Sequence, residues 1–229
     1  MHDLEKKGAC EDNMSLSDEL QEGVGSLWER VVTHPFIIEL GEGTLPQEIF
    51  EVYFEQDYLF VKELVILRSL AKAKAPDFDD AARHLGLGGE GGLFQQAFRE
   101  RGLSPQDVAN LEYRPTTLHY SSYLRKMAYE GRFIDLITTW LAVGWPYLEW
   151  AQRLVATGKR PDNYYYQTWI DNHTNQGMID FVSWLRYTVD TTPVSPPDRD
   201  RLQRIFRDVL RYEFLFWEMA YRNERWPEG

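Results

Sequence analysis

Two acidic residues lie where the pattern of the chain calls for apolar side chains, and they are the first candidates for chemistry. Asp57 follows Tyr53 by four residues and Glu213 follows Val209 by four, so each lies on an apolar helical face. An ionised carboxylate is costly to bury unless it is paired, protonated or turned toward a wet cavity. The pattern therefore predicts either two carboxylates of a proton-transfer site or, as the structural alternative, internal ion pairs and side chains that reach solvent.

The histidines add one further candidate. His173 shares an apolar face with Tyr166 and Ile170, where a core histidine with satisfied hydrogen bonds is the ordinary interpretation. None of the five histidines lies three or four residues from another, and the Glu-x-x-His repeat of di-iron bundles is absent. The sequence thus predicts no metal site, and its single cysteine, Cys10, excludes an intrachain disulfide.

The elements that must position these residues are helical throughout. Apolar residues recur with a period close to 3.6, and no convincing alternating strand appears. The run 36–40 is expected to be a connection between glycines and prolines. We predict one all-α domain over residues 15–229, preceded by a polar and disordered leader over residues 1–14. The expected helices are 16–31, 44–75, 79–85, 93–101, a short one opened by Ser104, 116–131, 133–155, 165–189 and a last one opened by Ser195.

Two local signals refine these helices. Thr44 and Gln47 have the spacing of a capping box, with Pro46 in the first turn. Pro146 lies deep inside the longest apolar helix, where it removes a backbone donor and predicts a kink two residues after Gly144. A kink among aromatic residues could form one wall for a flat aromatic ligand, although taken alone a simple packing adjustment is the better explanation.

Composition limits the partners. The 229 residues include 36 acidic and 25 basic side chains, a net charge of −11, and 33 aromatic residues that can fill a large core. An acidic chain without a basic block is poorly suited to nucleic acid or to anionic membrane surfaces. The longest apolar run, 136–148, is shorter than the roughly 20 residues that span a bilayer. Because the leader also lacks the apolar core of a secretory signal, we expect a cytoplasmic protein without membrane or nucleic-acid partners.

Five segments resemble the TenA family of thiaminase II-like proteins, and the resemblance extends over roughly residues 25–226. They are HPFIIELGEGTLPQEIFEVYFEQDY (34–58), PTTLHYSSYL (115–124), WPYLEW (145–150), YYQTWI (165–170) and YEFLFWEMAYRNERW (212–226). The resemblance implies a haem-oxygenase-like helical bundle, usually without haem and without another cofactor. It also implies a homo-oligomer, a tetramer or a dimer, and a small aminopyrimidine that is hydrolysed to its hydroxymethyl form in thiamine salvage.

The resemblance assigns roles to four residues of this sequence. Asp57 matches the aspartate that holds the aminopyrimidine, and Glu213 matches the acidic proton donor. Tyr120 and Tyr147 match tyrosines that bind the substrate. The two carboxylates that stand out by their spacing are thus the two that the family uses.

Three positions depart from the pattern of the classical members. Val143 stands where they have the catalytic cysteine, Phe60 where they have an assisting tyrosine, and His173 where they have another pocket tyrosine. Covalent attack by a thiolate at this position is therefore impossible. Phe60 and Val143 are expected to line the pocket, and His173 to bind substrate or to act as a second base.

These features favour a hydrolase of the cysteine-less branch, in which carboxylates perform acid–base chemistry without a thiol adduct. The first alternative is a non-catalytic aminopyrimidine-binding or regulatory protein. The second is a cofactor-free oxidase like PqqC, which would need more inward-facing histidine and arginine than His173 provides. Haem degradation is disfavoured because the helix expected over 16–31 has no histidine to bind the iron.

Overall fold

Helices are the regular elements of the computed structural model, which describes residues 14–86 and 91–227; no strand occurs in these two ranges. The helices are α1 (Leu16–Glu22), α2 (Ser26–Val32), α3 (Pro35–Glu42), α4 (Gln47–Lys74), α5 (Phe78–His84), α6 (Gly91–Glu100), α7 (Pro105–Ala109), α8 (Pro115–Glu130), α9 (Phe133–Ala156), α10 (Tyr164–Thr174), α11 (Gln176–Thr191) and α12 (Pro196–Tyr221). The expectation of an all-α fold is confirmed. The predicted leader, including Cys10, lies outside the described residues except for Met14, which is exposed.

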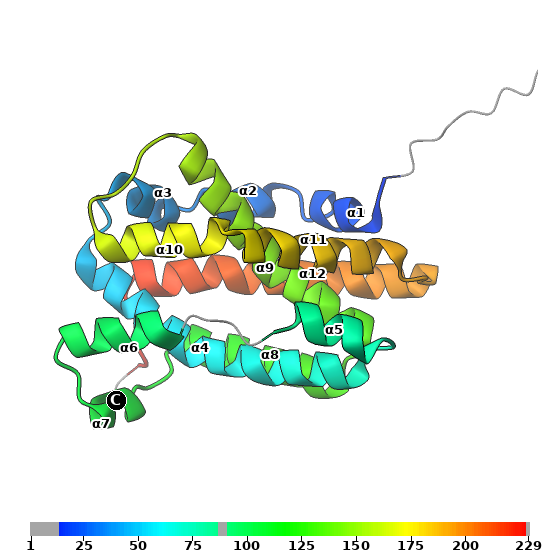
Figure 1. Ribbon diagram of the computed structural model, residues 1–229, viewed down its shortest axis with the longest axis horizontal. Helices are drawn as coiled ribbons and strands as arrows, with labels where there is room; N and C mark the ends of the chain where they lie inside the picture. The colour runs from blue at the N-terminus through cyan, green and yellow to red at the C-terminus, as the bar shows by residue number, and fades with distance from the viewer. Residues whose placement is uncertain (1–13, 87–90, 228–229) are drawn as a thin grey trace, which may run out of the picture.

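The long helices enclose the core. Helix α9 packs against α10, α11 and α12, and α12 also packs against α4 and α8. Figure 1 shows α10, α11 and α12 running nearly parallel across the molecule, with α4 and α8 on one side of them and α1, α2 and α3 on the other. Because α9 is apolar around most of its circumference, it can be surrounded by neighbours on several sides. The predicted site residues lie on five helices, namely α9 and the four that pack around it, α4, α8, α10 and α12.

Two predicted helices are each divided in two. The helix expected over 16–31 is interrupted between α1 and α2, where Gly25 has a φ of 57°, outside the right-handed helical region. The helix expected over 165–189 breaks at Asn175, whose side chain accepts a hydrogen bond from the Met178 backbone N–H at 2.9 Å and caps α11. A side-chain acceptor that offers the backbone an alternative partner ends one helix and begins the next.

The expectation of a connection at 36–40 is wrong, because these residues belong to α3. The His34 ring nitrogen Nδ1 accepts from the Phe36 backbone N–H at 3.1 Å, and Pro35 occupies the first helical position. The predicted capping box at Thr44 is also wrong, since Pro46 precedes α4 and provides no side-chain cap. Two other start signals are confirmed: Ser104 and Ser195 cap α7 and α12.

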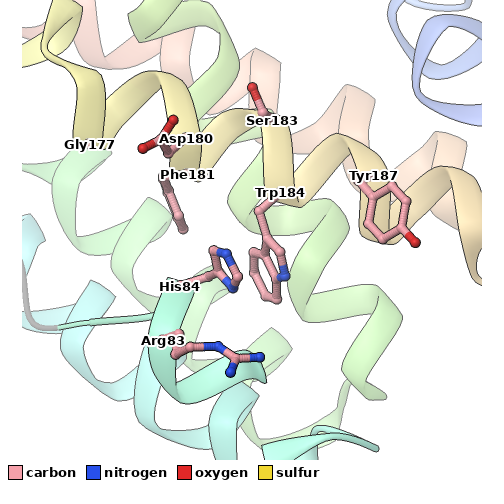
Figure 2. Close-up of a pocket in the computed structure, with 8 residues that line it drawn as sticks. All are labelled: Arg83, His84, Gly177, Asp180, Phe181, Ser183, Trp184 and Tyr187. Carbon is pink, nitrogen blue, oxygen red and sulfur yellow. The ribbon is translucent and has the colours of Figure 1, made fainter. Parts of the chain in front are cut away.

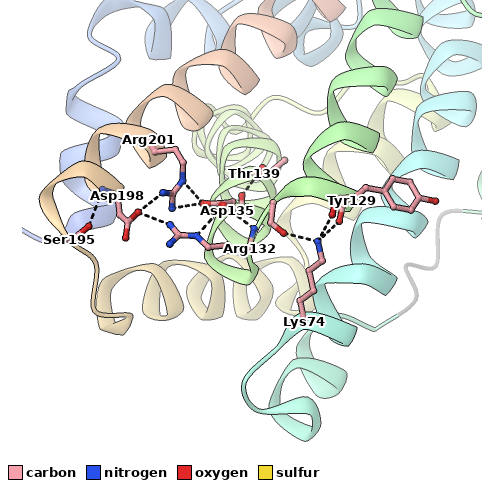
Figure 3. Close-up of polar contacts among 10 residues, drawn as sticks. Lys74, Tyr129, Arg132, Asp135, Thr139, Ser195, Asp198 and Arg201 are labelled. Atoms are coloured by element: carbon pink, nitrogen blue, oxygen red, sulfur yellow. Dashed lines mark hydrogen bonds and ion pairs between the residues drawn. The ribbon is translucent and has the colours of Figure 1, made fainter.

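Helix α9 is one continuous helix that contains Pro146, in agreement with the single helix expected over 133–155. Polar contacts fix its first turn to the first two turns of α12. Arg201 of α12 binds the Asp135 carboxylate at 2.9 Å, and Asp135 also accepts from the Arg132 backbone N–H at 2.9 Å (Figure 3). The Arg132 guanidinium in turn pairs with Asp198 at 2.7 Å. This network joins the N-terminal ends of two helices that carry predicted site residues.

Lys74 closes the C-terminal end of α8. Its ammonium donates to the backbone carbonyls of Ala128, Tyr129 and Gly131 at 2.8, 3.0 and 2.7 Å (Figure 3). Carbonyls in the last turn of a helix have no intrahelical partner, and a cation there also interacts favourably with the helix dipole. The contact attaches the last turn of α4 to the end of α8.

We expect Lys74→Met to lower the free energy of unfolding by about 1–3 kcal/mol, because three charge-assisted hydrogen bonds are lost. Urea denaturation of the variant, with Lys72→Met as control, checks this value. Lys72 lies two residues earlier in the same turn and has no side-chain hydrogen bond among the described residues. Equal losses in both variants would contradict the proposed capping role.

No helix among the described residues has a stretch long and apolar enough to cross a membrane.

Candidate active site

Glu213 of α12 lies at the centre of the bundle and is 1% exposed. Its carboxylate oxygen Oε1 accepts a hydrogen bond of 2.5 Å from the hydroxyl of Tyr120 on α8, which is also buried. The ring of Phe60, on α4, packs 4.7 Å from the Tyr120 ring. Three helices therefore bring these predicted residues together.

Asp57 lies on the same face of α4, three residues before Phe60, and is 5% exposed. One turn earlier on that helix, the hydroxyl of Tyr53 lies 3.2 Å from the hydroxyl of Tyr147 on α9, within hydrogen-bond distance. Burial raises the pKa of the Tyr53 phenol well above its usual value, and the negative charge of Asp57 raises it further. Tyr53 thus stays protonated and can donate or accept a hydrogen bond between the two helices.

His173 of α10 packs against Tyr147, with ring centroids 5.0 Å apart. Its Nδ1 lies 2.7 Å from the backbone carbonyl of Trp169, which can only accept, so Nδ1 carries the proton and Nε2 carries the lone pair. Burial lowers the pKa of His173 to about 4. At neutral pH the ring is therefore an uncharged base.

The pKa of Glu213 is shifted in the opposite direction to that of His173. Burial raises the pKa of its carboxyl group to about 8, and the hydrogen bond from Tyr120 only partly opposes this effect. Between pH 4 and pH 8 the cluster therefore contains a protonated carboxylic acid and an unprotonated imidazole. Two titratable groups with pKa values displaced in opposite directions are an arrangement suited to general acid–base catalysis.

Val143, at the position that the resemblance gives to the nucleophile, is 6% exposed and lies one turn before Tyr147 on α9. Its side chain is part of the same buried core, but it cannot act as a nucleophile. At the neighbouring Gly144 a Cβ would lie 3.6 Å from the Phe181 ring of α11, which is ordinary van der Waals contact, so the packing here does not require glycine.

Two buried aromatic residues that the sequence did not single out connect the halves of the cluster. Trp217, four residues after Glu213, has its ring 5.1 Å from Tyr53 and 5.3 Å from Tyr147. Phe216 has its ring 5.4 Å from Phe60. Their spacing on the apolar face of α12 is the signal that could have identified them.

The described residues contain no group of three or more His, Cys, Asp and Glu side chains placed to hold a metal ion. A separate hollow of about 630 Å³ opens between α5 and α11, and Figure 2 shows His84 and Trp184 beside each other at its wall. Their rings stack at 4.9 Å, and the charged lining residues Arg83 and Asp180 are exposed. None of the predicted site residues lines this hollow. The buried titratable groups at the centre of the bundle therefore remain the candidate active site.

This all-helical bundle has the haem-oxygenase-like fold, as its structural neighbours show. A haem oxygenase from the cyanobacterium Synechocystis matches over 92% of this chain and 94% of its own, with a TM-score of 0.65 and 12% identity. The family model of the TENA/THI-4/PQQC family matches residues 22–223, and the chain belongs to this family.

Relatives of known structure or assigned activity agree with this membership. An aminopyrimidine aminohydrolase of Halalkalibacterium halodurans is 29% identical over 93% of this chain and 98% of its own. A protein of the same name from Helicobacter pylori is 28% identical over 92% of this chain and all of its own. The solved TenA homologue of P. horikoshii OT3 is 26% identical, with a TM-score of 0.81 over 91% of this chain and 99% of its own.

Proposed function

We propose that the protein is an aminopyrimidine aminohydrolase of thiamine-pyrimidine salvage that works without a cysteine nucleophile and without a cofactor. Family membership and the names of the relatives support the substrate class. The observation that carries the chemistry is the buried Glu213, held by Tyr120 and kept protonated near neutral pH by burial.

In this proposal the substrate ring lies among the aromatic side chains of the cluster. Asp57 accepts hydrogen bonds from the ring amine and from a protonated ring nitrogen, which are the strong contacts of an ionised acceptor. Tyr120 and Tyr147 orient the ring, while Phe60 and Val143 line its apolar surroundings.

The substrate of the proposed reaction is an aminomethyl-pyrimidine. Glu213 donates its proton to the leaving nitrogen as the bond from the methylene carbon to nitrogen breaks, and the nitrogen leaves as ammonia. The oxygen of a water molecule bonds to the same carbon, and the proton released from this water goes to Nε2 of His173. Transfer of that proton to solvent and reprotonation of Glu213 complete the cycle, so that the net change is the replacement of an amine by a hydroxyl group.

The direct test is incubation of the purified protein with an aminomethyl-pyrimidine and with its formylated derivative, followed by mass spectrometry of the products. We expect the hydroxymethyl-pyrimidine, with one oxygen taken from labelled water. If the protein bound these compounds without converting them, the non-catalytic aminopyrimidine-binding protein would replace the hydrolase as the best-supported function.

Asp57→Asn is expected to weaken binding of the hydroxymethyl-pyrimidine product by about ten- to a hundredfold. The substitution keeps the volume but removes charge-assisted hydrogen bonds worth roughly 1.5–3 kcal/mol. Titration calorimetry measures the change, with Glu48→Gln as the control because Glu48 is an exposed acid on the same helix. Unchanged affinity in Asp57→Asn would remove Asp57 from the binding site.

Assembly and location follow the same resemblance. We propose a homo-oligomer of two or four chains in the cytoplasm, in line with the family resemblance and the near absence of cysteine. Light scattering coupled to size-exclusion chromatography measures the number of chains.

A further inference from the structure

The first turn of α8 is capped by a residue more than a hundred positions away. Glu224, which follows α12, accepts from the Thr116 backbone N–H at 2.9 Å through Oε2 and from the Thr116 hydroxyl at 3.0 Å through Oε1. Arg114, at the N-cap position of α8, makes no side-chain capping bond. A carboxylate at a helix N-terminus satisfies free backbone donors and interacts favourably with the helix dipole.

Further contacts hold the segment 222–227 against the residues before α8. The Arg114 guanidinium donates to the Asn223 side chain at 2.8 Å and to the backbone carbonyl of Glu224. The Trp226 indole N–H donates to the backbone carbonyl of Tyr113 at 2.8 Å. The segment is thus attached at several points and has a defined position on the start of α8.

This contact lies close to the candidate active site along two helices. Thr116 precedes Tyr120 by one helical turn, and the segment continues directly from α12, which carries Glu213. The hydrogen bond between Tyr120 and Glu213 therefore joins two helices that Glu224 also joins at their ends.

Helix α4, the third helix of the site, is also hydrogen-bonded to the residues before α8. The side chain of Gln56, buried on α4, accepts from the Arg114 backbone N–H at 2.9 Å and donates to the carbonyl of Glu112 at 2.9 Å. Gln56 is the neighbour of Asp57 in sequence. The segment before α8 is therefore held from both sides, by α4 next to Asp57 and by the residues that follow α12.

We propose that Glu224 is a positioning residue, which fixes the start of α8 so that the Tyr120 hydroxyl stays hydrogen-bonded to Glu213. A hydrogen bond weakens steeply when its length or angle changes, so a small displacement of α8 is enough to affect it. The kinetic part of this inference rests on the function proposed above, but the geometric part does not.

The titration of Glu213 reports on this bond. The titratable groups that interact with Glu213 are Tyr120 of α8 and Tyr53 of α4. Tyr147 interacts with both of these tyrosines, and Asp57 interacts with Tyr53. The bond from Tyr120 lowers the pKa of Glu213, opposing burial. A displaced α8 should therefore raise this pKa further, whereas a general loss of stability would leave the pKa of the folded protein unchanged.

The experiment measures the Glu213 titration in the ligand-free protein by carbon-13 NMR with labelled glutamate, using Glu213→Gln to assign the signal. We expect the pKa to rise in Tyr120→Phe, to rise part of the way in Glu224→Ala, and to return toward the wild-type value in Glu224→Gln. The amide oxygen of glutamine can still accept a hydrogen bond from the Thr116 backbone N–H, and its amide NH2 can donate to the Thr116 hydroxyl. Ser104→Ala is the matched control, since it removes the cap of α7, which carries no residue of the site.

Kinetics supply a second readout. In Glu224→Ala we expect kcat for the aminopyrimidine to fall about three- to tenfold, with KM nearly unchanged. The alkaline limb of the pH–rate profile should move to higher pH, because the pKa of Glu213 rises. Ser104→Ala should change neither quantity. If wild type hydrolysed the substrate while Glu224→Ala kept both its kcat and its Glu213 titration, the positioning role would be overturned and the function would stand. If wild type were inactive, the NMR comparison alone would decide the inference.

Discussion

Glu213→Gln should lower kcat for aminopyrimidine hydrolysis by about 10²- to 10⁴-fold, the usual contribution of general acid–base catalysis. Glutamine keeps the shape of the side chain and can still accept the hydrogen bond from Tyr120. It carries no proton that can be given to a leaving amine. Affinity for the hydroxymethyl-pyrimidine product should therefore stay within a few-fold of wild type, so that the loss appears in kcat.

Steady-state kinetics together with calorimetry separate these two effects. Asp208→Asn is the control, because Asp208 lies on the same helix and pairs with Arg211 at the surface. The wild-type rate should fall as pH rises through about 8, where Glu213 loses its proton, and again toward pH 4, where His173 gains one. Normal turnover in Glu213→Gln would exclude its role as the acid.

Much of the helical architecture could be predicted because the apolar period is long and regular. The start of α12 after Ser195 and the end of α4 shortly before Pro76 follow from local signals. The errors occur where one residue changes the backbone. Gly25 adopts a positive φ and Asn175 caps a new helix, and neither effect alters the apolar period on its two sides. Periodicity alone therefore predicts one continuous helix where the backbone forms two.

For the candidate site too, some features could be predicted from the sequence and others could not. The spacing of Asp57 and Glu213 predicts that both are buried, since each lies on an apolar face. Spacing cannot predict their partners, because Tyr120 and Glu213 are 93 residues apart, and Tyr53 and Tyr147 are 94 apart. The cap that Glu224 provides for α8 is likewise a contact between distant segments. The family resemblance supplied the roles of Tyr120 and Tyr147, while the bonds that hold them come from the fold.

A buried acid that is suited to catalysis should also reduce stability, and this gives the second large effect. Relative to wild type, Glu213→Gln should raise the free energy of unfolding by on the order of 4 kcal/mol above pH 8. In the unfolded chain Glu213 ionises near its usual pKa, whereas in the folded protein burial raises this pKa to about 8. Folding is therefore favoured at low pH, and this contribution is lost as pH rises from about 4.5 to about 8.

Glutamine does not ionise, so the difference in stability between variant and wild type should be small near pH 4.5 and should grow until pH 8. His173, whose lowered pKa acts in the acid range, is present in both proteins and cancels in the comparison. Urea denaturation at several pH values measures the difference. Glu48→Gln, which neutralises an exposed acid, should show no such growth. A difference that stayed constant from pH 4.5 to pH 8.5 would mean that Glu213 is already ionised in the folded protein, and a carboxylate in that state could not be the proton donor.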